Sequence, residues 1–271
     1  MHSISITDQT RRPPFRRSLA LAVRVIWALI MREVLTRYGR HNIGFLWLFF
    51  EPMLFTLGVT AMWSVAKSSH SATMSMVPFA LTGYSSVLLW RNTAGRCPKA
   101  IESNSSLMHH RNVKAVDIFI ARIFLEIAGS TMSFALLTCV FATLELAPWP
   151  SDVVGLAMAW ASLAGFATGL GLLLGALSEK SEVVDRLWHT LTYLLFPFSG
   201  AMFLVDWMPT NVQHLLLLLP MVHATEWVRH AYFGPAIRTF EEPLYLLGWD
   251  LVLIAVGLFM TQRVARTIEP E

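Results

Sequence analysis

The chain has 271 residues, of which 55% are hydrophobic and 14% are charged, and its formal net charge is +3. Soluble domains usually carry about 25% charged residues, so the composition excludes an ordinary soluble domain. Because the basic residues cluster beside apolar segments, they indicate membrane topology and lipid headgroup contacts rather than nucleic-acid binding.

The first residues of the chain are strongly basic. Eight arginines lie between Arg11 and Arg40. After a tail at residues 1–14, apolar residues recur at helical spacing from residue 15 to Tyr38, which predicts an amphipathic helix in the cytoplasmic membrane interface. The arginines do not stay on one face, so we expect this helix to break or rotate near its middle. Interface helix and connection together occupy residues 15–43.

A transmembrane domain is expected at residues 44–262. Its first apolar run contains a single ionisable residue, Glu51. At about 1.5 Å rise per residue, this run is long enough to cross the ~30 Å hydrocarbon core of a bilayer. Six such spans are predicted, and residues 263–271 form a cytoplasmic tail. The spans are expected at about 44–66, 76–97, 115–146, 153–177, 187–205 and 244–261.

The segment before the last span is different. The apolar stretch at residues 212–222 is too short to cross a bilayer and is interrupted by Pro220. It predicts a re-entrant segment of two half-helices at about residues 207–230. With this layout most lysines and arginines fall on one side, which places both termini in the cytoplasm.

Candidate catalytic chemistry is sparse. The sequence has no phosphate-binding glycine loop, so nucleotide is not expected to bind this chain by that route. His109 and His110 are adjacent rather than at metal-ligand spacing, and neither a metal site nor a cofactor is predicted. We therefore expect no catalytic residue and no enzymatic activity in this chain.

Several charged residues near the predicted spans have two interpretations. Glu51 precedes Pro52 inside the first span, where it would be a gating or subunit-contact residue, or a carboxylate paired with a nearby arginine. Arg91 would attract an anionic polymer in a passage, or reach the lipid headgroups. Arg122 and Glu126, four residues apart, are expected to form an ion pair along one helix face.

Aromatic and small residues also allow alternatives. Rings near the span ends are typical of an interfacial belt, although rings along a passage would stack on sugars. Small residues at four-residue spacing in the fourth span indicate close helix packing within one subunit, rather than a dimer seam. The rings are Tyr38, Trp63, Tyr84, Trp90, Trp160, Trp188 and Tyr193, and the small residues are Ala161, Gly165, Gly169, Gly171 and Gly175.

Residues 32–39 (REVLTRYG), followed by 44–47 (GFLW) and Glu51-Pro52, form a specific block. The sequence here resembles the membrane subunit of bacterial ABC-2 type polysaccharide exporters, the capsular polysaccharide (KpsM-type) permeases. The resemblance extends over roughly residues 30–262. Supporting matches are 100–104 (AIESN), 111–114 (RNVK), Ala121, Arg122, Leu125, Glu126, 220–223 (PMVH), Glu226 and Arg229.

The resemblance implies an all-α integral membrane protein with the ABC-2 (type V ABC exporter) fold. Two copies would form the channel of a transporter in the bacterial inner membrane. Two copies of a separate ATPase would supply ATP and Mg²⁺. The substrate would be lipid-linked capsular polysaccharide, passed to periplasmic and outer-membrane export proteins of the co-polymerase adaptor type.

The resemblance and the charge pattern together give three candidate residue sets. An ATPase coupling interface is expected at the interface helix and the loop after the second span, namely Arg32, Glu33, Arg37, Glu102, Ser103, Asn104, His109 and Arg111. A substrate channel is expected at Tyr38, Glu51, Tyr84, Trp90 and Arg91. A re-entrant gate is expected at Pro220, His223, Glu226 and Arg229.

Three other functions remain open from sequence. The same machinery would export O-antigen or teichoic acid instead of capsule. A membrane-embedded acyl- or glycosyltransferase would need a paired base and nucleophile, for which His223 with Glu226 is the only mild candidate. A passive channel would conduct without any ATPase.

Overall fold

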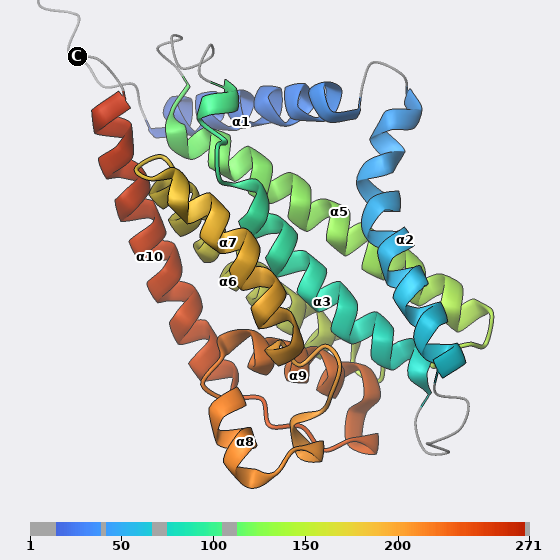
Figure 1. Ribbon diagram of the computed structural model, residues 1–271. Helices are drawn as coiled ribbons and strands as arrows, with labels where there is room; N and C mark the ends of the chain where they lie inside the picture. Colours follow the sequence, from blue (N-terminus) through green and yellow to red (C-terminus); the bar gives the residue numbers. More distant parts are fainter. Residues whose placement is uncertain (1–14, 39–41, 67–74, 105–112, 269–271) are drawn as a thin grey trace, which may run out of the picture.

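A computed structural model of the chain describes residues 15–38, 42–66, 75–104 and 113–268, and these contain helices, turns and loops. Long helices run side by side, one helix crosses one end of the bundle, and short helices gather at the other end (Figure 1). The helices are α1 (Phe15–Tyr38), α2 (Asn42–Ala66), α3 (Met76–Arg96), α5 (Ala115–Thr143), α6 (Val153–Ser178), α7 (Glu182–Leu195), α8 (Thr210–Leu216), α9 (Pro220–Phe233) and α10 (Pro243–Ile268).

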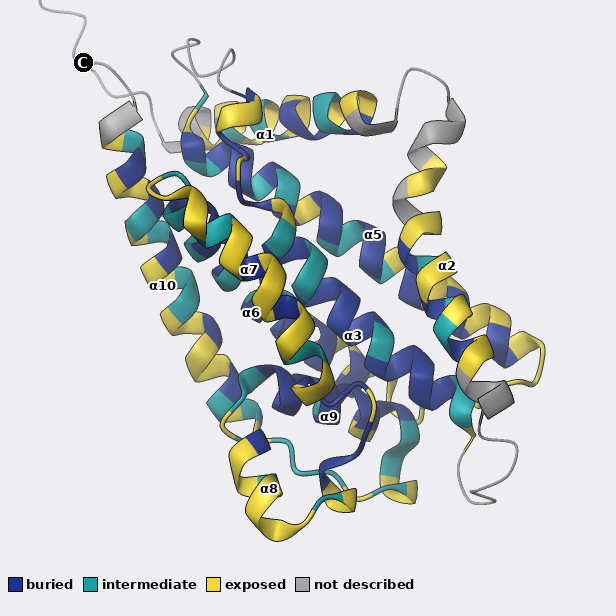
Figure 2. Ribbon diagram, viewed as in Figure 1, coloured by how far each residue is buried: buried dark blue, intermediate teal, exposed yellow. Residues whose placement is uncertain are grey.

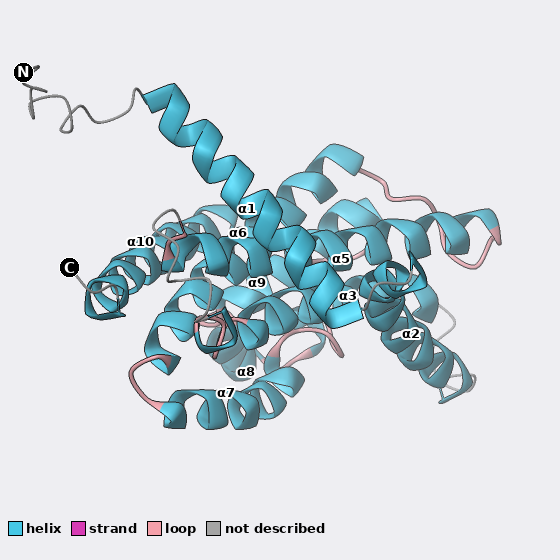
Figure 3. Cartoon of the chain, turned by 90° about the horizontal axis from the view of Figure 1, so that it is seen from above, coloured by secondary structure: helices cyan, strands magenta, loops and turns pink. Residues whose placement is uncertain are grey.

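The helix that crosses the bundle is α1, which lies over the ends of the other helices (Figures 1 and 3). Leu29, Ile30 and Val34 are buried against a cluster that includes residues of α5, whereas Trp27 is exposed. The predicted helix from residue 15 to Tyr38 is therefore present, and its amphipathic placement in the membrane interface stays a prediction. The expected break near its middle is wrong, because α1 is continuous and its sequence contains neither glycine nor proline.

Three described helices are long and apolar enough to cross a membrane: Ala115–Thr143, Val153–Ser178 and Pro243–Arg266. The described part of α2 has a shorter apolar stretch at Phe50–Met62. The layout with six spans stays a prediction.

The helix at the fifth predicted span is shorter than that span, whose bounds stay a prediction. Instead of a helix at residues 187–205, α7 ends at Leu195 and a 3₁₀ turn follows at Phe196–Phe198. Pro197 cannot donate a helical hydrogen bond, and Gly200 adopts a φ of +79°. The chain therefore leaves the helical path after 14 residues.

Close packing of α6 against α10 depends on two glycines. A Cβ atom on Gly169 would lie 2.6 Å from Cβ of Leu253, and one on Gly257 would lie 2.7 Å from Cβ of Leu172. Gly175 likewise faces the ring of Phe119 on α5. Gly169 and Gly175 thus pack closely within the chain, whereas Ala161 is exposed, and the choice between packing within one subunit and a dimer seam stays a prediction.

The core of the bundle is built around α3. Most of this helix up to Trp90 is buried, as its dark colour in Figure 2 shows. Leu81, Leu89 and Trp90 join Phe134 and Trp160 in the main apolar cluster, in which the last two rings stack at 4.4 Å. This packing fixes the C-terminal end of α3, where the helix becomes charged, beneath α1.

At the opposite end, two short helices, α8 and α9, occupy the segment for which the sequence predicts half-helices. Pro220 is the first residue of α9, a position where the missing amide hydrogen costs nothing. The turn between the two helices lies at residues 217–219. Re-entry of this segment into the membrane stays a prediction.

Candidate functional site

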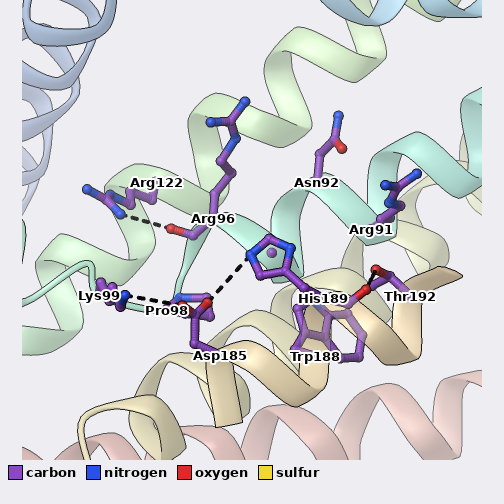
Figure 4. A pocket seen from close by; sticks show the side chains of 11 residues that line it. Arg91, Asn92, Arg96, Pro98, Lys99, Arg122, Asp185, Trp188, His189 and Thr192 are labelled. Atoms are coloured by element: carbon purple, nitrogen blue, oxygen red, sulfur yellow. Dashed lines mark hydrogen bonds and ion pairs between the residues drawn. The ribbon is translucent and has the colours of Figure 1, made fainter. Parts of the chain in front are cut away.

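A cavity of about 410 Å³ opens between the C-terminal part of α3 and α7. Arg91, Asn92 and Arg96 come from α3, while Asp185 and His189 come from α7 (Figure 4). Both arginines line this cavity from the charged C-terminal end of α3. The buried part of α3 and the packing of Trp188 against Trp90, at 6.3 Å between ring centroids, hold the two walls together.

The charges that line this cavity differ in how they are compensated. Lys99 Nζ lies 3.4 Å from Asp185 Oδ2, and His189 Nε2 lies 3.7 Å from the other oxygen of the same carboxylate. Arg91 instead lies over the ring of Tyr193, 5.1 Å from its centroid. No carboxylate of the described residues forms an ion pair with Arg91.

Arg96 connects the cavity to two other helices. Its guanidinium lies 3.2 Å from Glu51 of α2 and 3.7 Å from Glu126 of α5. The side chains of Arg96 and Glu51 are 43% and 47% exposed. The interpretation of Glu51 as a carboxylate paired with a nearby arginine is confirmed, and the partner is Arg96.

A second network joins α1 to the loop after α3. Arg32 donates a hydrogen bond from Nη1 to the side-chain oxygen of Asn104. Glu33 lies 3.0 Å from Nε of Arg122, which donates from Nη1 to the carbonyl oxygen of Arg96 at 2.9 Å. A cavity of about 270 Å³ lies between these groups. Arg122 and Glu126, expected to pair with each other, thus both have ionic partners on other helices.

The predicted coupling residues gather in one place as far as the structure describes them. Arg32 of α1 bonds to Asn104 of the loop, and Glu33 lines the same cavity, whereas Glu102 and Ser103 are exposed beside it. Ser103 donates to the carbonyl of Lys99 at 2.7 Å, which shapes the loop. His109, Arg111 and the side chains of Arg37 and Tyr38 lie outside the described residues.

Glu179 supports this loop from the end of α6. Burial raises the pKa of its carboxyl group. A hydrogen bond from the backbone of Ile101 lowers this pKa, and the charge of Glu102 raises it further. Glu179 is therefore a partly buried carboxylate whose pKa depends on Ile101 and Glu102 of the predicted coupling loop.

Of the predicted channel rings, Tyr84 and Trp90 lie in different surroundings. Tyr84 contacts Phe55 of α2 at 5.9 Å and Phe196 at 5.5 Å, measured between ring centroids. Trp90 is 1% exposed and belongs to the core. The prediction that Trp90 lines a channel is therefore wrong for this arrangement, because its ring is covered by packing.

Three of the predicted gate residues, His223, Glu226 and Arg229, are buried at the end of the bundle that carries α8 and α9. His223 contacts the carbonyl of Leu217 through Nε2 at 2.7 Å, and its Nδ1 accepts from the Glu242 amide at 3.1 Å. Glu226 accepts from the amides of Val205 and Phe240 at 3.4 and 3.3 Å. With both ring nitrogens engaged, the pair of His223 and Glu226 does not present a base to a substrate.

Arg229 holds the same end together. It is 0% exposed, and its two terminal nitrogens donate to the carbonyls of Gly200, Ala201 and Phe203 at 2.6 to 2.7 Å. Its guanidinium also lies 3.9 Å from the ring centroid of Phe79. Arginine supplies this fork of donors in one plane, which lysine cannot.

Sequence reasoning missed four residues of these networks: Arg96, Lys99, Asp185 and His189. The spacing of Asp185 and His189 was a usable signal, because residues four apart on a helix share a face. It also missed Asp250 of α10, whose Oδ2 accepts from Ser162 at 2.8 Å. An acidic residue within an apolar span was the signal there.

Metal coordination has no support in the described part of the chain. No group of three or more His, Cys, Asp or Glu side chains there is arranged to hold a metal ion. The site is thus a set of ionic contacts between helices, suited to binding charged groups.

Comparison with known proteins gives a consistent result. A family model for ABC-2 type transporters matches residues 24–233. The capsule polysaccharide export inner-membrane protein CtrC of Neisseria meningitidis serogroup B is 43% identical over 95% of this chain and 97% of its own length. BexB of Haemophilus influenzae, with the same description, is 42% identical over 97% and 98%. The polysialic acid transport protein KpsM of Escherichia coli is 27% identical over 85% and 90%.

Proposed function

The chain belongs to the ABC-2 type transporter family, and we propose that it is the permease subunit of an ATP-driven exporter of lipid-linked capsular polysaccharide across the bacterial inner membrane. The observation that carries this proposal is the similarity, at 42 to 43% identity and over nearly the whole chain, to inner-membrane proteins named for capsule polysaccharide export. The same observation favours capsule over O-antigen or teichoic acid as cargo.

The proposed topology has six spans with both termini in the cytoplasm. The charge pattern supports it, since the arginines of α1 and of the C-terminal end of α3 lie at one end of the bundle. In this topology α7 and the turn after it make the fifth crossing. Figure 1 shows α7 running from the α1 end toward α8 and α9.

The proposed coupling surface consists of α1 and the loop after α3, and it receives a separate ATPase that carries ATP and Mg²⁺. Exposed Glu102 and Ser103 offer polar contacts, while Arg32 and Asn104 tie the loop to α1 and Glu33 ties α1 to Arg122 of α5. Polar groups at such a surface contribute chiefly to specificity and association rate. Arg37, His109 and Arg111 complete the proposed set by their position in the sequence.

The proposed substrate path lies along α2, α3 and α7, in a channel formed with a second copy of the chain. Glu51, Tyr84 and Arg91 face this side of the protomer from α2 and α3, and Tyr38 joins them by sequence position. Arg91 is suited to attract an anionic polymer, because no described carboxylate neutralises it. The ring of Tyr84 offers a face for sugar stacking.

The outer end is proposed to contact periplasmic and outer-membrane adaptor proteins. Here α8 and α9 form the re-entrant gate, with Pro220 starting the second helix and His223, Glu226 and Arg229 holding it in place. Backbone that is not helical is tolerated at membrane depth where protein surrounds it, and Arg229 satisfies three such carbonyls.

The proposal is tested by complementation of a capsule-producing strain that lacks its own permease. The chain is expressed together with a candidate partner ATPase, and surface polysaccharide is measured. We expect export that is lost when the ATPase cannot hydrolyse ATP. Export that persists without hydrolysis would identify a passive channel, and polymer modified by the purified chain alone would identify an enzyme.

A further inference from the structure

The cavity between α3 and α7 is rich in positive charge. The described side chains that line it include four cations, Arg91, Arg96, Lys99 and Arg122, but only one carboxylate, Asp185. Figure 4 shows Arg91 and Arg96 projecting from neighbouring turns of α3, on either side of Asn92. A volume of about 410 Å³ leaves room for a small charged group together with water.

The four cations are not equally available. Lys99 is held by Asp185 at 3.4 Å. Arg122 is held by Glu33 at 3.0 Å, and both of these side chains are largely buried, at 13% and 12% exposed. Within the described part of the chain, Arg91 lies over the ring of Tyr193 and forms no ion pair, so it is a cation that a ligand can approach without displacing a described carboxylate.

Arg96 is the intermediate case. It is paired with Glu51 and Glu126, but the pair with Glu51 is exposed on both sides. Exposed pairs contribute little stability, because water screens them and long side chains lose freedom. Arg96 also lines three cavities: the one described above, one beside Glu51 and Glu126, and one beside α1. An anion that binds with modest affinity can therefore compete with Glu51 for the guanidinium of Arg96.

We propose that this cavity binds an anionic group, a phosphate or a carboxylate, through Arg91 and Arg96, and that Arg96 binds it in exchange for Glu51. Guanidinium groups bind both kinds of oxyanion through paired N–H donors. That this group belongs to the lipid anchor or to a sugar of the substrate rests on the proposed function. Because Glu51 belongs to α2, the exchange removes an ionic contact between α2 and α3 whenever the site is filled.

The first test measures anion binding by the full-length chain in phosphatidylcholine nanodiscs. The midpoint of thermal unfolding is followed against inorganic phosphate, at an ionic strength held constant with sodium chloride. A ligand that binds the folded state raises this midpoint. We expect a saturable rise for the wild type. A wild-type midpoint that does not respond to phosphate overturns the proposal.

The variants separate this site from other phosphate sites. We expect Arg91→Gln to weaken binding about tenfold or more, the effect of losing a charge-assisted contact. Glu51→Gln is expected to tighten it about three- to fivefold, because it removes a competitor as weak as an exposed ion pair. Arg91→Lys, which retains the charge, should bind between wild type and Arg91→Gln, and it serves if the glutamine variant does not fold.

Arg238→Gln is the matched control, since Arg238 is an exposed arginine that lies over Phe240 outside the cavity. It should bind phosphate as the wild type does. Equal half-saturation for Arg91→Gln, Arg96→Gln and Arg238→Gln would overturn the site. Binding by Glu51→Gln that is no tighter than that of the wild type would overturn the exchange.

Two further probes distinguish the source of the anion. Glycerol 3-phosphate represents a lipid headgroup and glucuronate represents an acidic sugar. A response to the first alone assigns the site to the lipid anchor, and a response to the second alone assigns it to the polymer, provided that Arg91→Gln reduces it. A response to neither overturns the proposal.

The complementation assay keeps this inference separate from the proposed function. If the wild type shows ATP-dependent export but substitution of Arg91 or Arg96 leaves phosphate binding unchanged, the anion site alone is rejected. The expected binding pattern without any export would retain the anion site and reject the proposed function.

Discussion

Arginine plays opposite roles at the two ends of this molecule. At the end with α8 and α9, Arg229 is fully buried, and its terminal nitrogens donate hydrogen bonds to three backbone carbonyls. At the end with α1, Arg96 is 43% exposed and shares its charge between two carboxylates on different helices. The first arrangement fixes a turn in one shape, whereas the second can exchange partners.

The contrast follows from the cost of burial. A charge removed from water is tolerated only where every nearby dipole is arranged around it, so such a residue becomes part of the scaffold. An exposed pair gains little and loses little when it opens. The α1 end is therefore the region in which ionic contacts can respond to a ligand or a partner.

The largest expected effect is at Arg229. Arg229→Met removes the donors of three buried carbonyls and leaves Glu226 without its neighbouring charge, and we expect a loss of about 3–5 kcal/mol in the free energy of unfolding. Denaturant unfolding in detergent measures it. Arg238→Met, at a side chain that is 75% exposed, should change stability by less than about 0.5 kcal/mol. Similar losses for both variants would erase the proposed contrast between the ends.

The next effect is at Arg122, whose side chain is largely buried although it lies at the α1 end. Arg122→Gln loses the ion pair to Glu33 and the bond to the Arg96 carbonyl. We expect a loss of about 1–3 kcal/mol and faster amide hydrogen exchange in α1, whose docking depends on this pair. The control is Arg186→Gln, whose pair with Glu182 is 80% exposed on both sides. Unchanged exchange in α1 would show that apolar packing alone docks this helix.

A smaller effect is expected for the exposed pair itself. A double-mutant cycle with Glu51→Gln and Arg96→Gln should give a coupling energy of about 0.2–1 kcal/mol at low salt. The coupling should fall in 1 M sodium chloride, where the Debye length is about 3 Å. A coupling that is larger and independent of salt would place this pair with Arg229, as a fixed element of the fold.

The smallest expected effect is on the pH dependence of the free energy of unfolding. Because burial raises the pKa of Glu179 above its ordinary value of 4.5, the folded state retains this proton to higher pH than the unfolded state does. The free energy of unfolding therefore falls as pH rises from 4.5 through the raised pKa. Glu179→Gln should be less dependent on pH over this window, as measured by unfolding at several pH values. Identical slopes for variant and wild type would contradict the assignment.

Much of the helical layout was predictable from hydropathy and helix-breaking residues. The bounds of α2, α3 and α6 follow the apolar runs closely, and Pro220 marks the start of α9. The early end of α7 was not predictable from hydropathy, because residues 196–205 remain apolar after the helix stops. Pro197 was visible, but a proline near a helix end is compatible with either a kink or a stop.

The candidate sites were predictable only in part. Arg91 and Glu51 stood out, because isolated charges beside apolar runs are conspicuous. Their partners did not stand out. Glu51 meets Arg96, forty-five positions away, and Arg122 meets Glu33 of α1. Trp90 was misassigned, since a ring near the end of a span has the same sequence signature whether it is covered or open.

The sequence by itself determined that this chain is a helical membrane protein and, through the block at residues 32–52, which family it belongs to. These properties depend on local hydrophobicity, charge and motif, which are carried by neighbouring residues. Only the tertiary structure decided which charges meet and which are buried. Those outcomes depend on how α3 packs between α2, α5 and α7, and contacts between distant segments leave no periodic trace in the chain.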